Sequence, residues 1–136
     1  MIVDTSALVA ILYEEDGADD LLAALVSEPA LMPAPAVLEF LRVAEMRSPE
    51  LGKIGRDLLK ELCGNGLEIL AFDERQAQIA GDANARYGKG MKNGGVLNLL
   101  DLMVYAAAKD RDEPVLCTGR DYASTDVSMH PASRSW

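Results

Sequence analysis

The apolar residues of this 136-residue chain follow two different spacings. Short apolar runs predict buried strands at residues 1–4, 30–32, 67–72 and 114–118, with a last short strand at 127–129. Between these runs, apolar residues recur every three or four positions, which predicts helices at residues 7–13, 19–28, 36–46, 48–63, 73–86 and 97–110. Because strands that alternate with helices pair in parallel, we expect an α/β fold with a short central parallel sheet and helices on both faces.

Local signals set the expected ends of these elements. Thr5 or Ser6 can cap the first helix, because short polar side chains accept hydrogen bonds from the free amides of a helix start. Four glycines within residues 87–95 predict a loop. No repeat divides the chain, so we expect one domain over residues 1–130, followed by a tail at 131–136.

Composition and charge narrow the class of protein. The net charge is −9, from 22 acidic and 13 basic side chains, which argues against a simple nucleic-acid-binding module and fits a metal site, a basic partner or plain solubility. Cys63 and Cys117 both lie among apolar neighbours, so we expect two buried free thiols. Without a leader or a membrane-spanning apolar run, the sequence predicts a cytoplasmic protein.

Two acidic residues lie at or just past the ends of predicted strands. Asp4 ends the first strand, and Asp121 follows the strand at 114–118 after a Gly-Arg step. Each has an ordinary structural explanation, as a helix N-cap or an Asx turn. In parallel sheets, however, ligands bind beyond the carboxyl ends of the strands, so both positions are also candidates for a binding site.

Two further acidic residues lie in the first turns of apolar helices. Glu39 can be a surface residue paired with Arg42, three positions on. Asp101 lies in a helix that is apolar all round and therefore expected to be buried, and Asn98 is the better N-cap there. A carboxylate in such a helix must be paired, protonated or bound to a metal.

These four carboxylates are expected at one edge of the sheet, where they would repel one another. Two unit charges ~4 Å apart cost about 4 kcal/mol at an effective dielectric near 20. Mg²⁺ or Mn²⁺ suits an all-oxygen site of this kind and offsets the repulsion. The only histidine, His130, lies near the C-terminus, which argues against zinc and excludes a Ser-His-Asp triad. No phosphate-binding P-loop motif is present.

The ordered set of motifs resembles the PIN-domain ribonucleases, and within them the VapC-type toxins of bacterial toxin–antitoxin pairs. The matching stretches are Met-Ile-Val-Asp-Thr-Ser-Ala at the start, Glu39, the loop that begins Arg-Tyr-Gly-Lys-Gly at residue 86, Leu-Asn-Leu-Leu-Asp-Leu-Met-Val-Tyr-Ala from Leu97, and Thr-Gly-Arg-Asp from Thr118. Two residues depart from the family pattern. Leu100 precedes Asp101 where a small residue is frequent, and Arg120 precedes Asp121 where an acidic or polar residue is frequent.

The resemblance implies a PIN-like three-layer fold and a Mg²⁺-dependent endoribonuclease, with Mn²⁺ as a possible substitute. It implies that Asp4 and Asp101 bind the metal and that Glu39 and Asp121 complete the catalytic site. Thr5, Ser6 and Thr118 are expected to hold a water or a phosphate oxygen. It also implies a homodimer and a cognate VapB-like antitoxin.

An RNA substrate would need local cations on this acidic protein. The candidates are the following side chains, which can equally be ordinary solvated loop charges: Arg86, Lys89, Lys92 and Arg120.

Two other kinds of protein remain alternatives. A PIN-like module without catalytic activity would only bind RNA or an antitoxin, although the chain has all four acidic residues. A phosphatase or phospho-acceptor domain that uses Asp4 is disfavoured, because a haloacid-type phosphatase needs a second aspartate at position 6, where Ser6 stands.

Overall fold

The computed structural model describes residues 1–133. Within that part the elements, in chain order, are β1 (Ile2–Val3), α1 (Thr5–Leu12), α2 (Ala18–Ser27), β2 (Leu31–Pro33), α3 (Ala34–Arg47), α4 (Pro49–Gly64), β3 (Glu68–Leu70), α5 (Glu74–Tyr87), α6 (Leu99–Arg111) and β4 (Val115–Leu116). Each predicted helix is present, and the ends differ from the prediction by a few residues.

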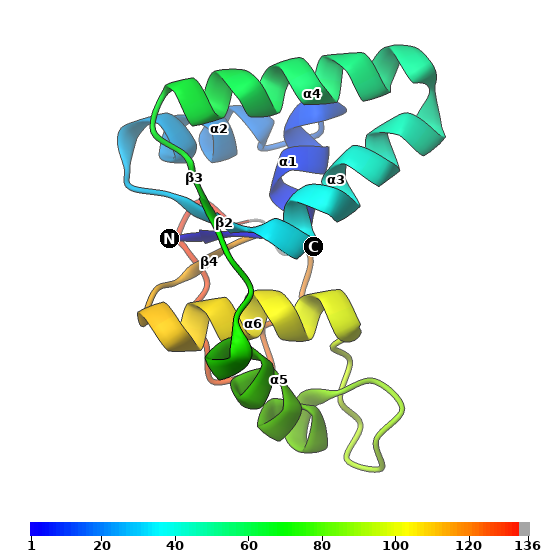
Figure 1. Ribbon diagram of the computed structural model, residues 1–136, viewed down its shortest axis with the longest axis vertical. Coiled ribbons are helices and arrows are strands. Elements are labelled where there is room, and N and C mark those ends of the chain that lie inside the picture. Colours follow the sequence, from blue (N-terminus) through cyan, green and yellow to red (C-terminus); the bar gives the residue numbers. More distant parts are fainter. Residues whose placement is uncertain (134–136) are drawn as a thin grey trace.

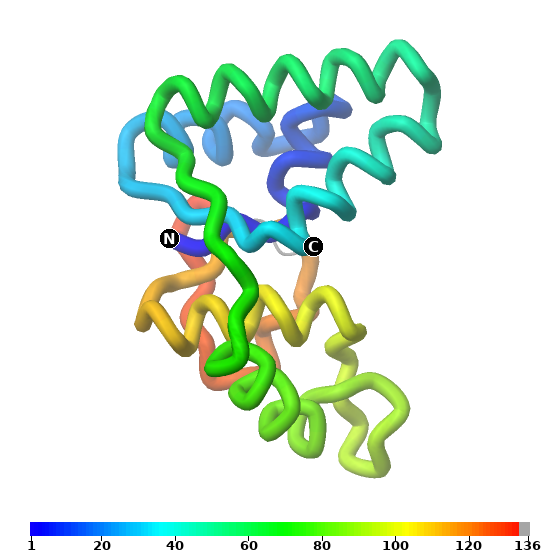
Figure 2. Tube along the Cα trace, viewed as in Figure 1, coloured from blue at the N-terminus to red at the C-terminus, as the bar shows by residue number. Residues whose placement is uncertain are grey.

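The four strands form one parallel sheet in the order β3-β2-β1-β4. Helices α1 to α4 lie on one side of the sheet, and α5 and α6 lie on the other (Figures 1 and 2). The central strand β1 is fully buried, since Ile2 and Val3 have no exposed surface. The predicted three-layer α/β fold is therefore confirmed.

The first helix begins at Thr5, and its cap lies one residue before the first of the two predicted cap residues. Asp4 has an extended backbone (φ −82°, ψ 153°), and its carboxylate accepts a hydrogen bond from the amide of Ser6. Asp4 is therefore the N-cap of α1, which was one of the two explanations given for it, and the prediction of Thr5 or Ser6 as the cap was wrong. The reason is that β1 ends at Val3, which leaves Asp4 as the last extended residue before the helix.

Helix α6 begins at Leu99, two residues later than predicted, and is capped by Asn98 as expected. Asn98 and Asp101 form a capping box, in which each side chain accepts from the other residue's backbone amide at 2.9 Å. The prediction that this helix is buried all round was wrong for its first turn, where Leu99 is 67% exposed and Asp101 is half-buried. Burial is complete only from Val104 to Ala108.

The chain after β4 returns to the sheet. The predicted strand at 127–129 is reduced to one parallel bridge between Val115 and Met129. The described part of the expected tail packs on β4, because the Ser133 hydroxyl donates to the Val115 carbonyl and accepts from the Cys117 amide. The rest of that tail lies outside the described residues.

The two cysteines are both free, but only Cys117 is buried. The prediction of a buried Cys63 was wrong. Its neighbour Leu62 occupies the inward face of α4, so the next residue along the helix points to solvent.

Candidate metal centre

Four carboxylates lie at or near the carboxyl edge of the parallel sheet. Strands β1 and β4 are direct neighbours, and the amide of Asp4 donates to the Leu116 carbonyl at 3.0 Å. The residues that follow these two strands therefore meet, which places Asp4 beside the turn that carries Asp121. Helices α3 and α6 contribute Glu39 and Asp101. We call these four residues the acidic edge.

Asp4 is held by three hydrogen bonds. Its Oδ2 accepts from the backbone amide of Ser6 at 2.9 Å and from the Ser6 hydroxyl at 2.5 Å. Its Oδ1 accepts from the hydroxyl of Tyr122 at 2.8 Å. Only 8% of the Asp4 surface is exposed, so these donors take the place of much of the water that a surface carboxylate would have.

The hydroxyl residues beside Asp4 serve the fold as well. The Ser6 hydroxyl accepts from the Thr118 amide at 3.0 Å and so joins the start of α1 to the segment after β4. Thr5 is buried, and its hydroxyl donates to the Ala36 carbonyl at 3.0 Å, which ties α1 to α3. For Thr118 the contact involves the backbone rather than the side chain.

The electrostatics of Asp101 show that the four acidic residues influence one another. The pKa of Asp101 is raised to about 6, first by burial and then by the negative charges of Asp4, Asp121 and Glu39, in that order of importance. The hydrogen bond from the Asn98 amide acts in the opposite direction. The charged side chains that act on the Asp101 carboxylate are thus acidic, and their repulsion favours a bound cation.

Glu39 and Asp121 are the more accessible members of the acidic edge. Glu39 is half-buried and lies in the second turn of α3, because that helix starts at Ala34 rather than at the predicted residue 36. No ion pair joins it to Arg42 within residues 1–133. Asp121 is exposed in the turn after β4.

The four candidate RNA contacts are all exposed. Lys89 and Lys92 lie in the loop between α5 and α6, and Arg120 lies in the turn that carries Asp121. Arg86 is in the last turn of α5, and its guanidinium lies 5.1 Å from the centre of the Tyr87 ring. None of them forms an ion pair with another described residue, which leaves their charges available to a ligand.

Tyr122 is a site residue that the sequence analysis missed. It is 2% exposed, and the desolvation that comes with burial, together with the charges of Asp4 and Asp101, raises its pKa well above the ordinary value of 10. The hydroxyl therefore keeps its proton and remains a donor. A signal was present in the sequence, because a tyrosine directly after Asp121 at a buried sheet edge needs a partner for its hydroxyl.

The donor set fits a hard divalent cation in its chemistry. It consists of carboxylate oxygens, and Asp101 has a raised pKa caused in part by the other three. No group of three acidic, histidine or cysteine side chains within residues 1–133 is already arranged around a common point as a metal cage. The Asp101 carboxylate instead accepts from the amide of Asn98.

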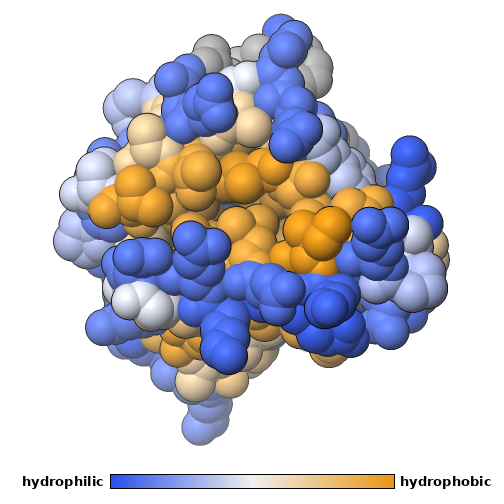
Figure 3. Space-filling model, turned by 90° about the horizontal axis from the view of Figure 1, so that it is seen from above, coloured by the Kyte–Doolittle hydropathy of each residue, from blue (hydrophilic) through white to orange (hydrophobic). Residues whose placement is uncertain are grey.

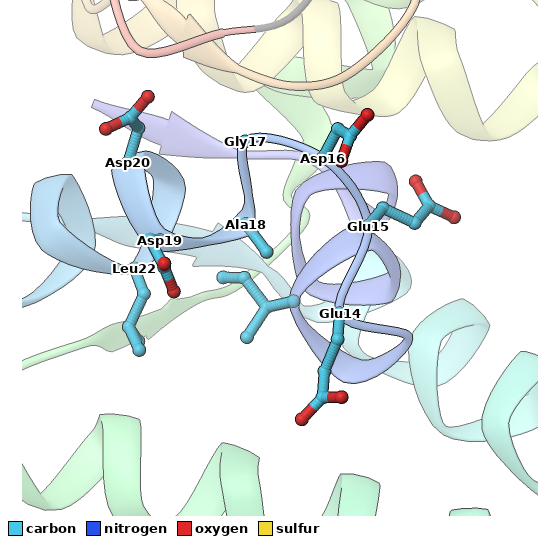
Figure 4. Close-up of a pocket in the computed structure, with 9 residues that line it drawn as sticks. Glu14, Glu15, Asp16, Gly17, Ala18, Asp19, Asp20 and Leu22 are labelled. Atoms are coloured by element: carbon cyan, nitrogen blue, oxygen red, sulfur yellow. The ribbon is translucent and has the colours of Figure 1, made fainter.

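A second group of acidic residues surrounds an open hollow at the other end of α1. Glu14, Glu15 and Asp16 lie in the connection to α2, and Asp19 and Asp20 lie in the first turn of that helix. Figure 4 shows that these side chains point away from one another rather than toward a common centre. We call this group the acidic hollow.

The face of the molecule that carries α1 to α4 is crossed by an apolar band (Figure 3). Helices α2 and α4 leave several apolar side chains partly or largely exposed, among them Leu22, Val26, Ile54, Leu58 and Leu59. A further apolar hollow lies beside Glu39 and is lined by residues of α3, α6 and the segment after β3: Leu38, Val43, Phe72, Leu100 and Met103. Within the described residues, no helix is long and apolar enough to cross a membrane.

Comparison with known proteins agrees with this architecture. The PIN domain profile matches residues 1–127. The chain is 39% identical over 129 residues to the VapC ribonuclease Mb2780c of Mycobacterium bovis, covering 93% of this chain and 96% of that protein. It is 40% identical over 129 residues to the ribonuclease VapC of Mycolicibacterium smegmatis, covering 94% and 98%.

Two solved structures share the fold at low sequence identity. VapC20 of Mycobacterium tuberculosis, a Sarcin-Ricin loop cleaving toxin, has a TM-score of 0.73 at 11% identity and covers 95% of this chain and 97% of that one. VapBC2 from Rickettsia felis, bound to a DNA fragment from its promoter, has a TM-score of 0.73 at 14% identity and covers 99% and 97%. The chain therefore belongs to the PIN-domain family and, within it, to the VapC ribonucleases.

Proposed function

We propose that this chain is a toxin of a toxin–antitoxin pair that hydrolyses RNA phosphodiester bonds internally, with Mg²⁺ bound at the acidic edge and Mn²⁺ as a substitute. The observation that carries the proposal is the meeting of Asp4, Glu39, Asp101 and Asp121 at one edge of the sheet, where burial and then the charges of the other three raise the pKa of Asp101. The VapC ribonucleases are metal-dependent nucleases, and a cluster of repelling carboxylates is the kind of site that such an ion stabilises.

In this proposal Asp4 and Asp101 hold the ion. When bound, the ion polarises the phosphodiester group and lowers the pKa of the attacking water. Glu39 and Asp121 are accessible enough to complete the site and to orient that water. Ser6 positions Asp4 through two hydrogen bonds and links it to the backbone of Thr118, while Thr5 supports the same region through Ala36.

The RNA would be held through its phosphates. Arg120 precedes Asp121 in the same exposed turn and adds a positive charge near the acidic edge, while Arg86, Lys89 and Lys92 supply positive charge at the α5–α6 loop. Contacts of this kind position a nucleic acid without reading its bases. Replacing Lys89 and Lys92 by alanine is expected to weaken RNA binding and to reduce its salt dependence.

We further propose that the cognate partner is a VapB-like antitoxin with an amphipathic, basic segment. The apolar band over α1 to α4 can bury the apolar side of such a segment, and the acidic hollow next to it attracts its positive charges. The overall charge of −9 also favours binding of a basic segment. A basic inhibitor arm can also oppose the acidic edge and so block the site.

A homodimer is proposed through the apolar hollow beside Glu39. Leu38 is 69% exposed and Leu99 is 67% exposed, which is unfavourable for large aliphatic side chains in water. Leu38 lines this hollow, and Leu99 lines an adjoining one that shares Phe72 and Met103 with it. Since Glu39 and Arg42 are the only charged residues among the described residues of the two linings, a second copy related by a two-fold axis suits this surface better than a basic segment does. Sedimentation of the Leu38→Asp variant, compared with wild type, tests this assignment, and an unchanged dimer contradicts it.

The experiment that tests the function uses purified protein, a structured RNA and Mg²⁺. Wild type is expected to cut the RNA internally, to lose activity with EDTA and to regain it with Mg²⁺ or Mn²⁺. Asp101→Asn, which keeps an acceptor for the capping box, should remain folded yet neither cleave RNA nor arrest bacterial growth.

The alternative is a PIN-like module that binds RNA or an antitoxin without cleaving. It is favoured if calorimetry detects no Mg²⁺ or Mn²⁺ binding at millimolar concentration and RNA stays intact.

Because the substrate proposed for the ribonuclease is cellular RNA, we propose that the protein acts in the cytoplasm.

A further inference from the structure

Two buried tyrosines each donate a hydrogen bond to an aspartate of a distant segment. The Tyr122 hydroxyl donates to Asp4 Oδ1 at 2.8 Å, and the Tyr105 hydroxyl donates to Asp126 Oδ1 at 2.6 Å. The rings are equally buried, with 2% and 1% of their surface exposed. They differ in the acceptor, since Asp4 is a buried member of the acidic edge, whereas Asp126 is exposed and pairs with Lys109.

The local contacts of Asp4 leave half of its carboxylate without a partner. The amide and hydroxyl of Ser6 both bind Oδ2, so they hold one oxygen at the start of α1. The carboxylate can still rotate about that anchored oxygen. The only donor to Oδ1 in the described residues is Tyr122, which comes from a segment 118 residues later in the chain.

The position of Tyr122 in the chain couples this contact to another member of the acidic edge. It directly follows Asp121, in a short turn closed by a hydrogen bond from the Ala123 amide to the Arg120 carbonyl. The same turn therefore exposes the Asp121 side chain to solvent and places the Tyr122 hydroxyl against Asp4. A shift of the turn would move Asp121 and release Asp4 together.

We propose that Tyr122 is a positioning residue of the metal site, whose hydroxyl sets the orientation of the Asp4 carboxylate. The inference rests on the proposed function, because it assigns Tyr122 a role toward the metal that Asp4 is proposed to hold. Donors that orient a metal-binding carboxylate are worth about 10- to 100-fold in metal affinity or activity when they are removed. Tyr122 acts through Asp4, so we do not count it as a catalytic residue.

The test compares Tyr122→Phe with the matched control Tyr105→Phe. Each variant keeps the ring and removes one buried hydroxyl that donates to an aspartate. Mn²⁺ binding is measured by calorimetry without RNA, and RNA cleavage is measured across a range of Mg²⁺ concentrations. Circular dichroism and thermal unfolding without metal show how far each variant keeps its fold. Tyr122→Met, which also lacks the hydroxyl, is the second variant if the phenylalanine variant does not fold.

Tyr122→Phe is expected to raise the Kd for Mn²⁺ about tenfold or more, and to raise the Mg²⁺ concentration needed for half-maximal cleavage by a similar factor. Excess metal should restore much of the activity. Tyr105→Phe should keep the metal affinity of wild type even where it loses as much thermal stability. Equal metal affinity in Tyr122→Phe and wild type would overturn the inference.

A third variant separates this inference from the proposed function. Asp4→Asn keeps the N-cap and removes the charge. If Asp4→Asn abolishes Mn²⁺ binding and Tyr122→Phe does not change it, only the role of Tyr122 is wrong. If wild type binds no Mn²⁺, or Asp4→Asn binds it as well as wild type does, the proposed metal site is wrong and the inference falls with it.

Discussion

The two ends of helix α1 both carry clusters of acidic residues, but the clusters differ in how they arise. The acidic hollow at the C-terminal end consists of neighbours in the sequence, at residues 14–20. The acidic edge at the N-terminal end combines residues from four segments, which are separated by at least 20 positions along the chain. A cluster of the first kind needs no tertiary structure, whereas one of the second kind exists only in the folded protein.

The two clusters differ in burial, and this difference decides which of them favours a bound metal ion. The acidic side chains of the hollow spread into solvent, where water and salt screen their repulsion (Figure 4). At the acidic edge Asp4 is buried and Asp101 is half-buried with a pKa of about 6. Repulsion that water cannot screen must be offset by another charge, and this distinguishes a metal site from an acidic surface. The acidic hollow is therefore a weaker candidate for a metal site than the acidic edge.

The largest expected effect is on RNA cleavage. Asp101→Asn should lower the rate about 100-fold or more, because a proposed metal ligand is removed and ligands matter more than the groups that orient them. Asp16→Asn, the matched substitution in the acidic hollow, should leave the rate unchanged. Cleavage of a labelled RNA at saturating Mg²⁺ measures both variants, and comparable rates for the two would contradict the distinction drawn between the clusters.

Metal should stabilise the fold through the acidic edge alone. At a Mn²⁺ concentration of about 100 times the Kd, the free energy of unfolding should rise by about 2.7 kcal/mol in wild type. Asp4→Asn should lose this gain, and Asp16→Asn should keep it. Thermal unfolding with Mn²⁺ or with EDTA gives the difference. A gain that survives in Asp4→Asn would mean that the metal binds elsewhere.

Without metal, Asp101 should make stability depend on pH. Its folded pKa, about 6, lies above its ordinary value of 3.8, so the native state holds this proton more tightly than the unfolded state does. The stabilisation is full below about pH 4 and is lost as the pH rises through 6. After allowance for solvent screening, we expect the free energy of unfolding to fall by about 1 kcal/mol over this pH range.

Denaturation with urea in EDTA at pH 4 and pH 7 measures this loss. The Asp101→Asn variant lacks the titrating group, so it should lose less stability than wild type over the same range. Equal losses in the two proteins would show that Asp101 does not titrate differently in the folded state.

The smallest effect is expected in the acidic hollow. Replacing Glu14, Glu15 and Asp16 by their amides should slow association with the cognate antitoxin about threefold at low salt, because long-range attraction affects the association rate first. RNA cleavage by the free protein should not change. Stopped-flow association at two salt concentrations tests this, and a rate unaffected by the substitutions would remove the hollow from the antitoxin surface.

The order of the elements follows from the sequence because each element is specified by nearby residues. Apolar spacing predicts every helix, and the caps at Ser48, Asp73 and Asn98 are local hydrogen bonds within a few residues. The error in the cap of α1 arises because several local signals compete. Thr5, Ser6 and Asp4 can all cap a helix, and the choice depends on where strand β1 ends against its neighbours.

The sequence by itself also predicts that Asp4 and Asp121 lie at the same edge, since the carboxyl ends of parallel strands meet there. Only the tertiary structure decides how each carboxylate is held and charged. The bond from Tyr122 to Asp4 spans 118 residues, and the pKa of Asp101 depends first on its burial and then on charges from three other segments. Periodicity describes neighbours along the chain, whereas burial and charge depend on distances in space. The chemistry proposed for Asp4 and Asp101 therefore depends on contacts that form only when the strands and helices pack together.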